Sequence, residues 1–286
     1  MSMASASWCP PEWLELRESA DAAARAPELL EPLRDHLPHA PRPGRPLVVR
    51  DLGCGTGSMG RWLSGRLPGP QHWILHDRDT ALLAHAAQAT PGAAADGAPV
   101  TVETRNADIT RLRAADLFGT HVVTASALLD LLDADEVDRL AAACVTAGCP
   151  ALLTLSVVGR VELDPAEELD ADLAAAFDAH QRRLTHGRRL LGPDAVTTAT
   201  EAFHSYGATV YTHPSPWRLD AEHAALTAEW LRGWVTAACE QRPELEPAAR
   251  DYLSRRLQEC EAGRLRAAVH HTDLLALPGD APGAPR

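Results

Sequence analysis

The chain has 286 residues, which is enough for one large domain or for one domain with an added cap. Its formal net charge is −12, and it contains arginine but no lysine. This acidic balance argues against a broad nucleic-acid-binding surface, which would need a basic face. No apolar run is long enough to span a membrane, and the N-terminus lacks the apolar core of a signal peptide. We therefore expect a cytoplasmic protein that binds neither nucleic acid nor a membrane.

The cysteines show no metal-binding pattern. None forms a CxxC pair or another spacing typical of metal ligands, and the six are Cys9, Cys54, Cys144, Cys149, Cys239 and Cys260. We expect most of them to be buried free thiols in a reducing compartment, and we predict no metal site.

The N-terminal region is expected to be a helical cap. Residues 1–37 predict a helical segment, and the positions near one face of it are Trp13, Leu16, Ala20 and Ala24. The proline-rich connector at 38–46 ends this segment, because proline removes a helical hydrogen bond. We assign residues 1–45 to the cap and its linker.

A regular alternation of strands and helices follows. The strands are expected within residues 47–53, 72–77, 100–108, 121–132 and 150–159. Helical patterns lie between them, and Asp79 or Thr80 is a plausible N-cap for the helix after the second strand. Short apolar strands that alternate with helices predict a parallel sheet covered on both faces.

The alternation ends after residue 159. We expect a polar, mostly helical insertion at 160–195, and then a late strand, two helices and a final strand at about 203–219, 220–241, 246–262 and 264–278. Residues 279–286 are expected to form a disordered tail. The predicted main domain therefore covers residues 46–278.

A glycine-rich loop after the first strand predicts a ligand site. In "LVVRDLGCGTGSMGRWL" (47–63), an apolar run leads into closely spaced glycines and then into a helix. Glycines are needed there because any Cβ would keep a ligand from the backbone N–H groups. Gly55, Gly57 and Gly60 match G-x-G-x-x-G, so a nicotinamide dinucleotide must be weighed.

Acids at the ends of three strands discriminate between the possible ligands. Asp51 stands two residues before Gly53, where its carboxylate would repel a pyrophosphate but favour the ammonium and sulfonium of S-adenosylmethionine (SAM). Asp77, at the end of the second strand, can accept both ribose hydroxyls of either ligand. Asp108 can accept the adenine amino group, with Ala107 and Ile109 on either side of the ring.

These motifs resemble the class I SAM-dependent methyltransferase family. "VVRDLGCGTG", "HWILHDRDTALL", "RNADIT" and "HVVTASALLDLL" are similar to successive family motifs over residues 47–158. The resemblance implies an α/β Rossmann-like fold with a seven-stranded, mostly parallel sheet and a reversed late hairpin. It also implies a cofactor site that includes Asp51, Gly53, Cys54, Gly55, Gly57, Asp77, Arg78, Ala107, Asp108, Ile109 and Ser126. We interpret Cys54 as a spacer rather than a nucleophile.

The methyl acceptor is expected beyond the carboxyl ends of the strands. "SALLD" after the fourth strand resembles small-molecule enzymes of the family and lacks the Asn/Asp-Pro-Pro-aromatic pattern of nucleobase and protein-amide methyltransferases. His180 is the best candidate for a general base, because it lies on the stripe Leu173, Phe177, His180 and Leu184; a packed core histidine is an equally good interpretation. Asp130 is a second catalytic candidate that can orient a substrate group. His270 and His271 are expected far from the pocket.

Residues of the N-terminal cap can complete the site. Arg17 and Arg25, eight residues apart, would point the same way on one helix, and we predict that Arg17 binds the cofactor and Arg25 the substrate. The alternative for both is a solvated helix face. We also predict aromatic walls for the substrate pocket from Trp8, Trp13, Phe177 and Trp217. Trp230 and Trp234, four residues apart, predict core packing or a homodimer contact.

We therefore predict a SAM-dependent methyltransferase that acts on a small molecule at a hydroxyl or carboxylate oxygen and releases S-adenosylhomocysteine (SAH). Three alternatives remain at this point. They are an NAD(P)-dependent oxidoreductase, a SAM-binding protein without catalysis, and an RNA or protein methyltransferase.

Overall fold

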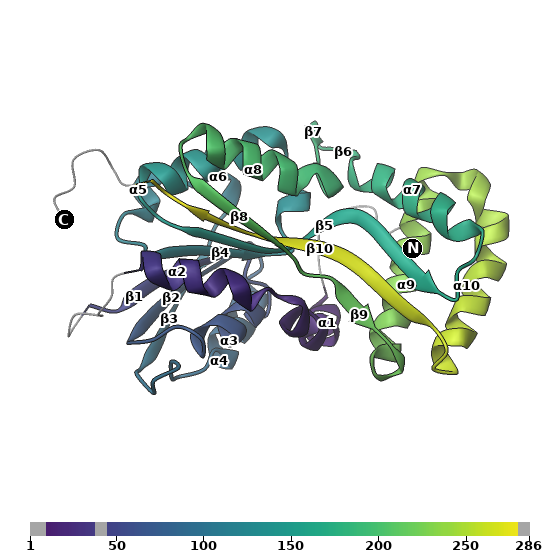
Figure 1. Cartoon of the computed structure of the whole chain (residues 1–286), viewed down its shortest axis with the longest axis horizontal. Helices are drawn as coiled ribbons and strands as arrows, with labels where there is room; N and C mark the ends of the chain where they lie inside the picture. The colour runs from purple at the N-terminus through teal and green to yellow at the C-terminus, as the bar shows by residue number, and fades with distance from the viewer. Residues whose placement is uncertain (1–9, 38–44, 280–286) are drawn as a thin grey trace.

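The protein is built around one mixed β-sheet (Figure 1). The computed structural model describes residues 10–37 and 45–279. The order of the strands in the sheet is β3 (Val100–Asn106), β2 (Gln71–Asp77), β1 (Leu47–Leu52), β4 (Val122–Ser126), β5 (Ala151–Asp164), β10 (Arg266–Leu277) and β8 (Thr209–Pro214). Strands β1 to β5 run parallel to one another, and β10 runs antiparallel to its neighbours β5 and β8. The Rossmann-like prediction is confirmed, and a short eighth strand, β9 (Trp217–Leu219), pairs with β10.

Helices cover both faces of the parallel part of the sheet. One face carries α5 (Ala114–Leu117), α6 (Ala134–Thr146) and α8 (Ala195–Ser205), and the other carries α2 (Leu30–His36), α3 (Ser58–Ser64) and α4 (Thr80–Ala89) (Figure 1). Strand β1 is almost wholly buried between these layers, which explains its apolar start. Asp79 is the N-cap of α4, and its side chain accepts hydrogen bonds from the backbone of Ala81 and Leu82.

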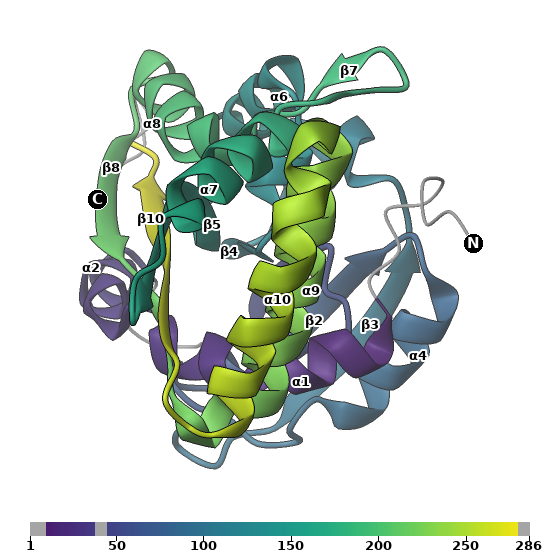
Figure 2. The ribbon, with the colours of Figure 1, turned by 90° about the vertical axis from the view of Figure 1, so that its right-hand side faces the viewer.

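A third group of elements extends the sheet at one end. Here β5 and β10 continue past the parallel strands, and α7 (Leu169–Gln181), α9 (Ala224–Gln241) and α10 (Glu246–Glu261) pack beside them (Figure 2). Helix α1 (Pro11–Ala24) crosses the edge of this group next to β9. Trp230 and Trp234 stack at 5.3 Å between ring centroids inside it, so core packing accounts for this pair.

Some boundaries differ from the sequence prediction. Strand β5 runs on to Asp164, so the insertion begins with α7 and continues through a small hairpin, β6 (Leu184–Thr185) and β7 (Arg188–Arg189). The single late strand expected at 203–219 is the end of α8 followed by two strands, β8 and β9. The break has a local reason, because Pro214 and Pro216 interrupt the chain between them.

Two helical alignments are also corrected. Helix α7 ends at Gln181, so Leu184 lies on the hairpin with 73% of its surface exposed and does not continue the predicted stripe. Helix α1 ends at Ala24, two residues before the Ala26–Pro27 step, because a residue before proline avoids the helical conformation. Arg25 therefore leaves the helix and does not share a helical face with Arg17.

Other expectations concern the surface and the thiols. Within residues 10–37 and 45–279, no helix is both long and apolar enough to cross a membrane. The described cysteines are free, and all but the half-buried Cys239 are buried, as expected. Cys9 lies outside the described residues. The same part of the chain holds no cluster of three or more potential metal ligands.

Candidate active site

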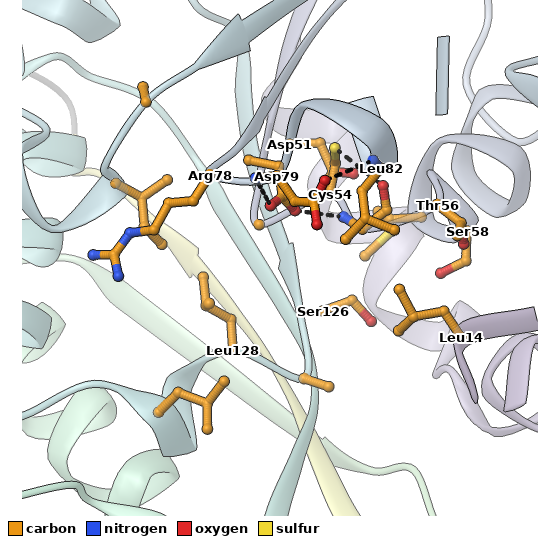
Figure 3. A pocket seen from close by; sticks show the side chains of 18 of the residues that line it. Leu14, Asp51, Cys54, Thr56, Ser58, Arg78, Asp79, Leu82, Ser126 and Leu128 are labelled. Atoms are coloured by element: carbon orange, nitrogen blue, oxygen red, sulfur yellow. Dashed lines mark hydrogen bonds between the residues drawn. The ribbon is translucent and has the colours of Figure 1, made fainter. Parts of the chain in front are cut away.

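A cavity of about 530 Å³ opens at the carboxyl ends of β1, β2 and β4. Ligands of open α/β sheets bind at this edge, and the volume is within the range of small-molecule sites. Figure 3 shows Arg78 on one side of the cavity and Leu14 of α1 on the other. The wall includes these predicted cofactor residues: Asp51, Gly53, Cys54, Gly55, Asp77, Arg78, Ala107, Ile109, Ser126 and Arg17. Gly57 and Asp108 are not part of the wall.

The glycine loop allows two helices to approach it closely. Gly57 has φ of +87°, and a Cβ there would lie 3.1 Å from the Cβ of Ala86 on α4. Gly55 has φ of +54°, and its Cβ would lie 3.1 Å from the Cδ1 of Leu14 on α1. Larger residues are therefore disfavoured by both backbone strain and space. The loop forms one side of the cavity, with α1 and α4 packed against it.

Asp51 presents a buried carboxylate to the cavity. Its side chain is 1% exposed, and Oδ1 accepts a hydrogen bond of 2.8 Å from the Thr124 hydroxyl on β4. Oδ2 has no hydrogen-bond partner among the described residues. Burial raises the pKa of Asp51 to about 7, against the opposing effects of Thr124 and Arg25. An unsatisfied buried carboxylate oxygen is costly, and a cationic ligand group would satisfy it.

Asp77 lies at the end of β2 and joins two loops. Its Oδ2 accepts a hydrogen bond of 2.9 Å from the backbone of Gly55, and its Oδ1 accepts one of 2.9 Å from the backbone of Asp79. Each oxygen keeps a second lone pair. Asp77 can therefore hold the loop and still accept hydroxyl groups from a ligand in the cavity.

Ala107 and Ile109 line the far end of the cavity, and Asp108 stands between them outside the wall. Oδ1 of Asp108 accepts hydrogen bonds from Arg78 Nη2 at 2.5 Å and from the backbone of Thr110 at 3.0 Å. Burial raises the pKa of Asp108, but these hydrogen bonds outweigh it and bring the pKa to about 2. Asp108 is thus ionised and already shapes the loop beside the cavity.

Arg25, which follows the end of α1, is buried behind the cavity wall and is not itself part of that wall. Its side chain is 2% exposed, and Nη2 donates hydrogen bonds to the hydroxyls of Ser58 (3.0 Å) and Ser126 (3.1 Å), two residues of the cavity wall. Nε and Nη1 have no partner among the described residues. Burial lowers the pKa of Arg25. A fixed guanidinium with free N–H groups fits an anionic ligand group.

The predicted aromatic residues lie beside this cavity rather than in its wall. Trp13 and Trp217 meet edge to face, with ring centroids 6.4 Å apart. Phe177 packs on the apolar cluster around α7 and α9. Trp8 lies outside the described residues.

The two catalytic candidates have different surroundings. His180 ends α7, where its Nε2 lies 3.2 Å from Glu240 Oε2 and its Nδ1 lies 3.3 Å from Arg183 Nη1. Neither His180 nor Asp130 is part of the cavity wall. Asp130 lies on the 3₁₀ turn Leu129–Leu131 just after β4, and it forms no ion pair or side-chain hydrogen bond with another described residue. Burial raises the pKa of Asp130, and the positive charges of Arg17 and Arg183 act in the opposite direction.

Sequence reasoning missed several residues that build the site. Thr124 meets Asp51 only through the pairing of β4 with β1. Asp273, 1% exposed on β10, accepts hydrogen bonds from the backbone of Ala26 (2.9 Å) and Leu155 (2.8 Å) and from the Ser215 hydroxyl (2.5 Å). Asp273 thereby fixes the residue next to Arg25. A lone acid inside the apolar strand "HHTDLLAL" was the available signal.

Comparisons with known proteins agree with this geometry. Residues 49–148 match the sequence profile of a family described as a methyltransferase domain. The search of curated proteins returned no match. Similar solved structures include the cyclopropane synthase MmaA2 from Mycobacterium tuberculosis, with 13% identity and a TM-score of 0.45 over 94% of this chain and 98% of that one.

Two structures described as SAM-dependent methyltransferases in complex with SAH are also similar. The protein from Thiobacillus denitrificans has 14% identity and a TM-score of 0.44 over 94% of this chain and 99% of its own. The protein from Geobacter sulfurreducens has 16% identity and a TM-score of 0.43, over 94% and 98% of the two chains. Because all three TM-scores are below 0.5, no residue role is taken from these structures.

The family profile covers the segment that carries the glycine loop and the strand-end acids, and the sheet and cavity around that segment are those expected for it. Residues 49–148 of this chain therefore carry a methyltransferase domain.

Proposed function

We propose that this protein transfers the methyl group of SAM to an oxygen atom of a small-molecule acceptor. The observation that carries the proposal is a pair of unsatisfied buried charges beside the glycine loop. Asp51 has a carboxylate oxygen without a partner, and Arg25 has two guanidinium nitrogens without partners among the described residues. SAM ends in an ammonium group and a carboxylate, so the two side chains are complementary to its amino-acid end. We assign Arg25, rather than Arg17, to that carboxylate.

The remaining cofactor contacts follow the wall of the cavity. Asp77 is suited to the two ribose hydroxyls, because each of its oxygens has a free lone pair. Ala107 and Ile109 of the cavity wall are suited to the two faces of the adenine ring, and Asp108, outside the wall, holds their loop through Arg78 and Thr110. Cys54 is buried, and burial raises the pKa of its thiol, which supports a spacer rather than a nucleophile.

The residues around the methyl position would align the acceptor and exclude water. Bound SAM supplies a methyl group that its sulfonium has already activated. Leu14, Leu128 and Leu132 give the cavity apolar walls, which favour a desolvated acceptor. Asp130 is our candidate for the base that takes the hydroxyl proton, because it lies directly after β4, next to the wall residue Leu131, and pairs with no other described residue. Burial raises the pKa of its carboxyl. His180 is the weaker candidate, since both of its ring nitrogens are close to other side chains.

Mass spectrometry with candidate acceptors tests the proposal. Purified protein would be incubated with SAM and a library of small hydroxyl and carboxyl compounds, and we expect one class to gain a single methyl group with matching release of SAH. Acceptor-dependent release would exclude a SAM-binding protein without catalysis. Release of SAH only with RNA or protein substrates would contradict the small-molecule assignment.

Calorimetry with SAH tests the cofactor site separately. Asp77→Ala should weaken SAH binding by about 10- to 100-fold, because a charged acceptor of two hydroxyls is lost. Asp77→Asn should weaken it less, and Asp251→Ala, on the exposed face of α10, is the matched control. Unchanged binding in Asp77→Ala would refute the assigned cofactor pose.

A further inference from the structure

Arg17 is a fixed cation on the wall of the cavity, and the cofactor assignment leaves it without a role. It lies on α1, its side chain is 13% exposed, and its Nε donates a hydrogen bond of 2.9 Å to Asp21 Oδ2. Asp21 is itself 4% exposed, and its Oδ1 accepts a hydrogen bond of 2.9 Å from Trp217 Nε1 on β9. The guanidinium is thus held from one side by a buried acid.

Two aromatic rings hold the same guanidinium. Its central carbon lies 5.0 Å from the ring centroid of Trp217 and 6.0 Å from that of Trp13. Arginine stacks in this way because its planar cation is weakly hydrated. The terminal nitrogens, Nη1 and Nη2, form no hydrogen bond with any described residue. The side chain is therefore fixed in position while its bidentate edge remains available.

The groups that face Arg17 do not neutralise this edge. His271 packs on Trp217 with 5.3 Å between ring centroids. Burial, and then Arg17, lower its pKa to about 3, so the ring is uncharged. Asp130 is close enough to interact electrostatically with Arg17 but is not paired with it. Asp21 already accepts its hydrogen bond from Arg17 Nε. The two terminal nitrogens of Arg17 are therefore available to an anionic group of a ligand.

Arg17 and Arg25 interact electrostatically but stand differently toward the cavity. Arg25 lies behind Ser58 and Ser126, where it supplies a buried guanidinium for the cofactor carboxylate, whereas Arg17 lies in the cavity wall itself. Leu14, one turn before Arg17, packs over Gly55, so α1 carries Arg17 on the glycine-loop side of the cavity. Figure 3 shows Leu14 beside Ser58 and Ser126, across the pocket from Arg78.

We propose that Arg17, held by Asp21 and Trp217, binds a carboxylate of the methyl acceptor, so that the acceptors are small hydroxy acids. The inference rests on the proposed methyl transfer to oxygen. A bidentate arginine occupies both oxygens of a carboxylate and withdraws their charge, so the attacking oxygen is a separate hydroxyl. That oxygen bonds to the methyl carbon while the carbon–sulfur bond breaks towards sulfur, and the hydroxyl proton passes to the Asp130 carboxylate.

Binding to SAH-loaded protein tests the inference without knowledge of the natural acceptor. The probes are 2-, 3- and 4-hydroxybenzoate and 3-phenyllactate, each compared with its uncharged amide by ligand-observed NMR titration. We expect at least one acid to bind about 10- to 100-fold more tightly than its amide, as for a charged hydrogen-bonded pair. Equal binding of every acid and its amide would overturn the inference.

Variants assign the preference to Arg17. Arg17→Gln should abolish the preference for acids, Arg17→Lys should retain part of it, and Arg250→Gln, on the exposed surface of α10, should leave it intact. SAH affinity should change by less than about twofold in all three, because Arg25 holds the cofactor carboxylate. Loss of SAH affinity in Arg17→Gln with an unchanged acid preference would overturn the inference and return Arg17 to the cofactor site. Failure of wild-type protein to bind SAH would instead contradict the proposed function itself.

Discussion

The cofactor half of the site and the acceptor half are assembled from different parts of the chain. Most of the proposed cofactor residues come from successive strand ends between β1 and β4, in chain order. Arg25 is the exception, because Asp273 fixes the neighbouring Ala26 across 247 positions. The proposed acceptor half joins α1 to β9, where Trp217 Nε1 donates a hydrogen bond to Asp21 across 196 positions. The cofactor half is thus mostly local in sequence, whereas the acceptor half exists only after the chain has folded.

The two halves also have separate cores. The apolar cluster around α7, α9 and α10 contains Trp217, Trp230 and Trp234, whereas two other clusters fill the faces of the parallel strands. Because the cluster around α7, α9 and α10 contributes no residue of those helices to the cavity wall, stability and cofactor affinity should respond to different mutations.

Trp234→Ala is the largest expected effect and tests this separation. Trp234 is 1% exposed and stacked on Trp230, so its removal should lower the free energy of unfolding by about 3–5 kcal/mol. SAH affinity, measured by calorimetry where the variant is still folded, should stay within about twofold of wild type. Urea unfolding gives the stability.

Trp234→Phe is the matched control, because the buried Trp234 Nε1 has no partner among the described residues. This substitution keeps most of the ring and removes the unsatisfied donor, so its cost should be below about 1.5 kcal/mol. A fall in SAH affinity that follows the loss of stability in both variants would show that the two halves share one core.

The cofactor half was also easier to predict from the sequence than the acceptor half. Asp51, Asp77 and the glycines could be found because each lies at a strand end within its own motif. The environment of Asp51 could not, because Thr124 and Arg25 reach it through sheet pairing and through the end of α1. Helical periodicity placed Arg25 on the same helix face as Arg17, which is wrong. The periodicity of the apolar residues does not show that Pro27, two residues after Arg25, ends the helix.

The acceptor side was harder to predict for a physical reason. The long β10 carries His271 under Trp217, a contact that nothing in its own segment indicates. Strand periodicity gives the face on which a side chain lies but not the element that will pack on that face.

The pH dependence of SAH binding tests the role proposed for Asp51 in the cofactor half. The pKa of Asp51 rises from an ordinary value near 3.8 to about 7 on folding. Its contribution to the stability of the free protein is therefore complete below the unfolded pKa and is lost as the pH rises through about 7. SAH offers an ammonium partner to the ionised form, so its affinity should fall about tenfold per pH unit below about 7.

Calorimetry or thermal shift with SAH between about pH 5 and 8 measures this dependence. The stabilisation by SAH should grow as the pH rises, and Asp51→Asn should bind SAH weakly with a flat profile. The same slope in Asp51→Asn and wild type would assign the proton to another group and remove Asp51 from the ammonium site.

His180→Gln is the smallest expected effect and separates the two catalytic candidates. Both ring nitrogens of His180 lie close to other side chains, those of Glu240 and Arg183, so methyl transfer should change by less than about twofold. Asp130→Asn should slow the same step by about 100-fold or more, because loss of a positioned general base typically costs that much. Single-turnover rates with SAM and the acceptor identified by mass spectrometry compare the two variants. A large fall in His180→Gln together with a normal rate in Asp130→Asn would place the base on α7, and the acceptor would then have to reach past Arg17 towards the helical extension.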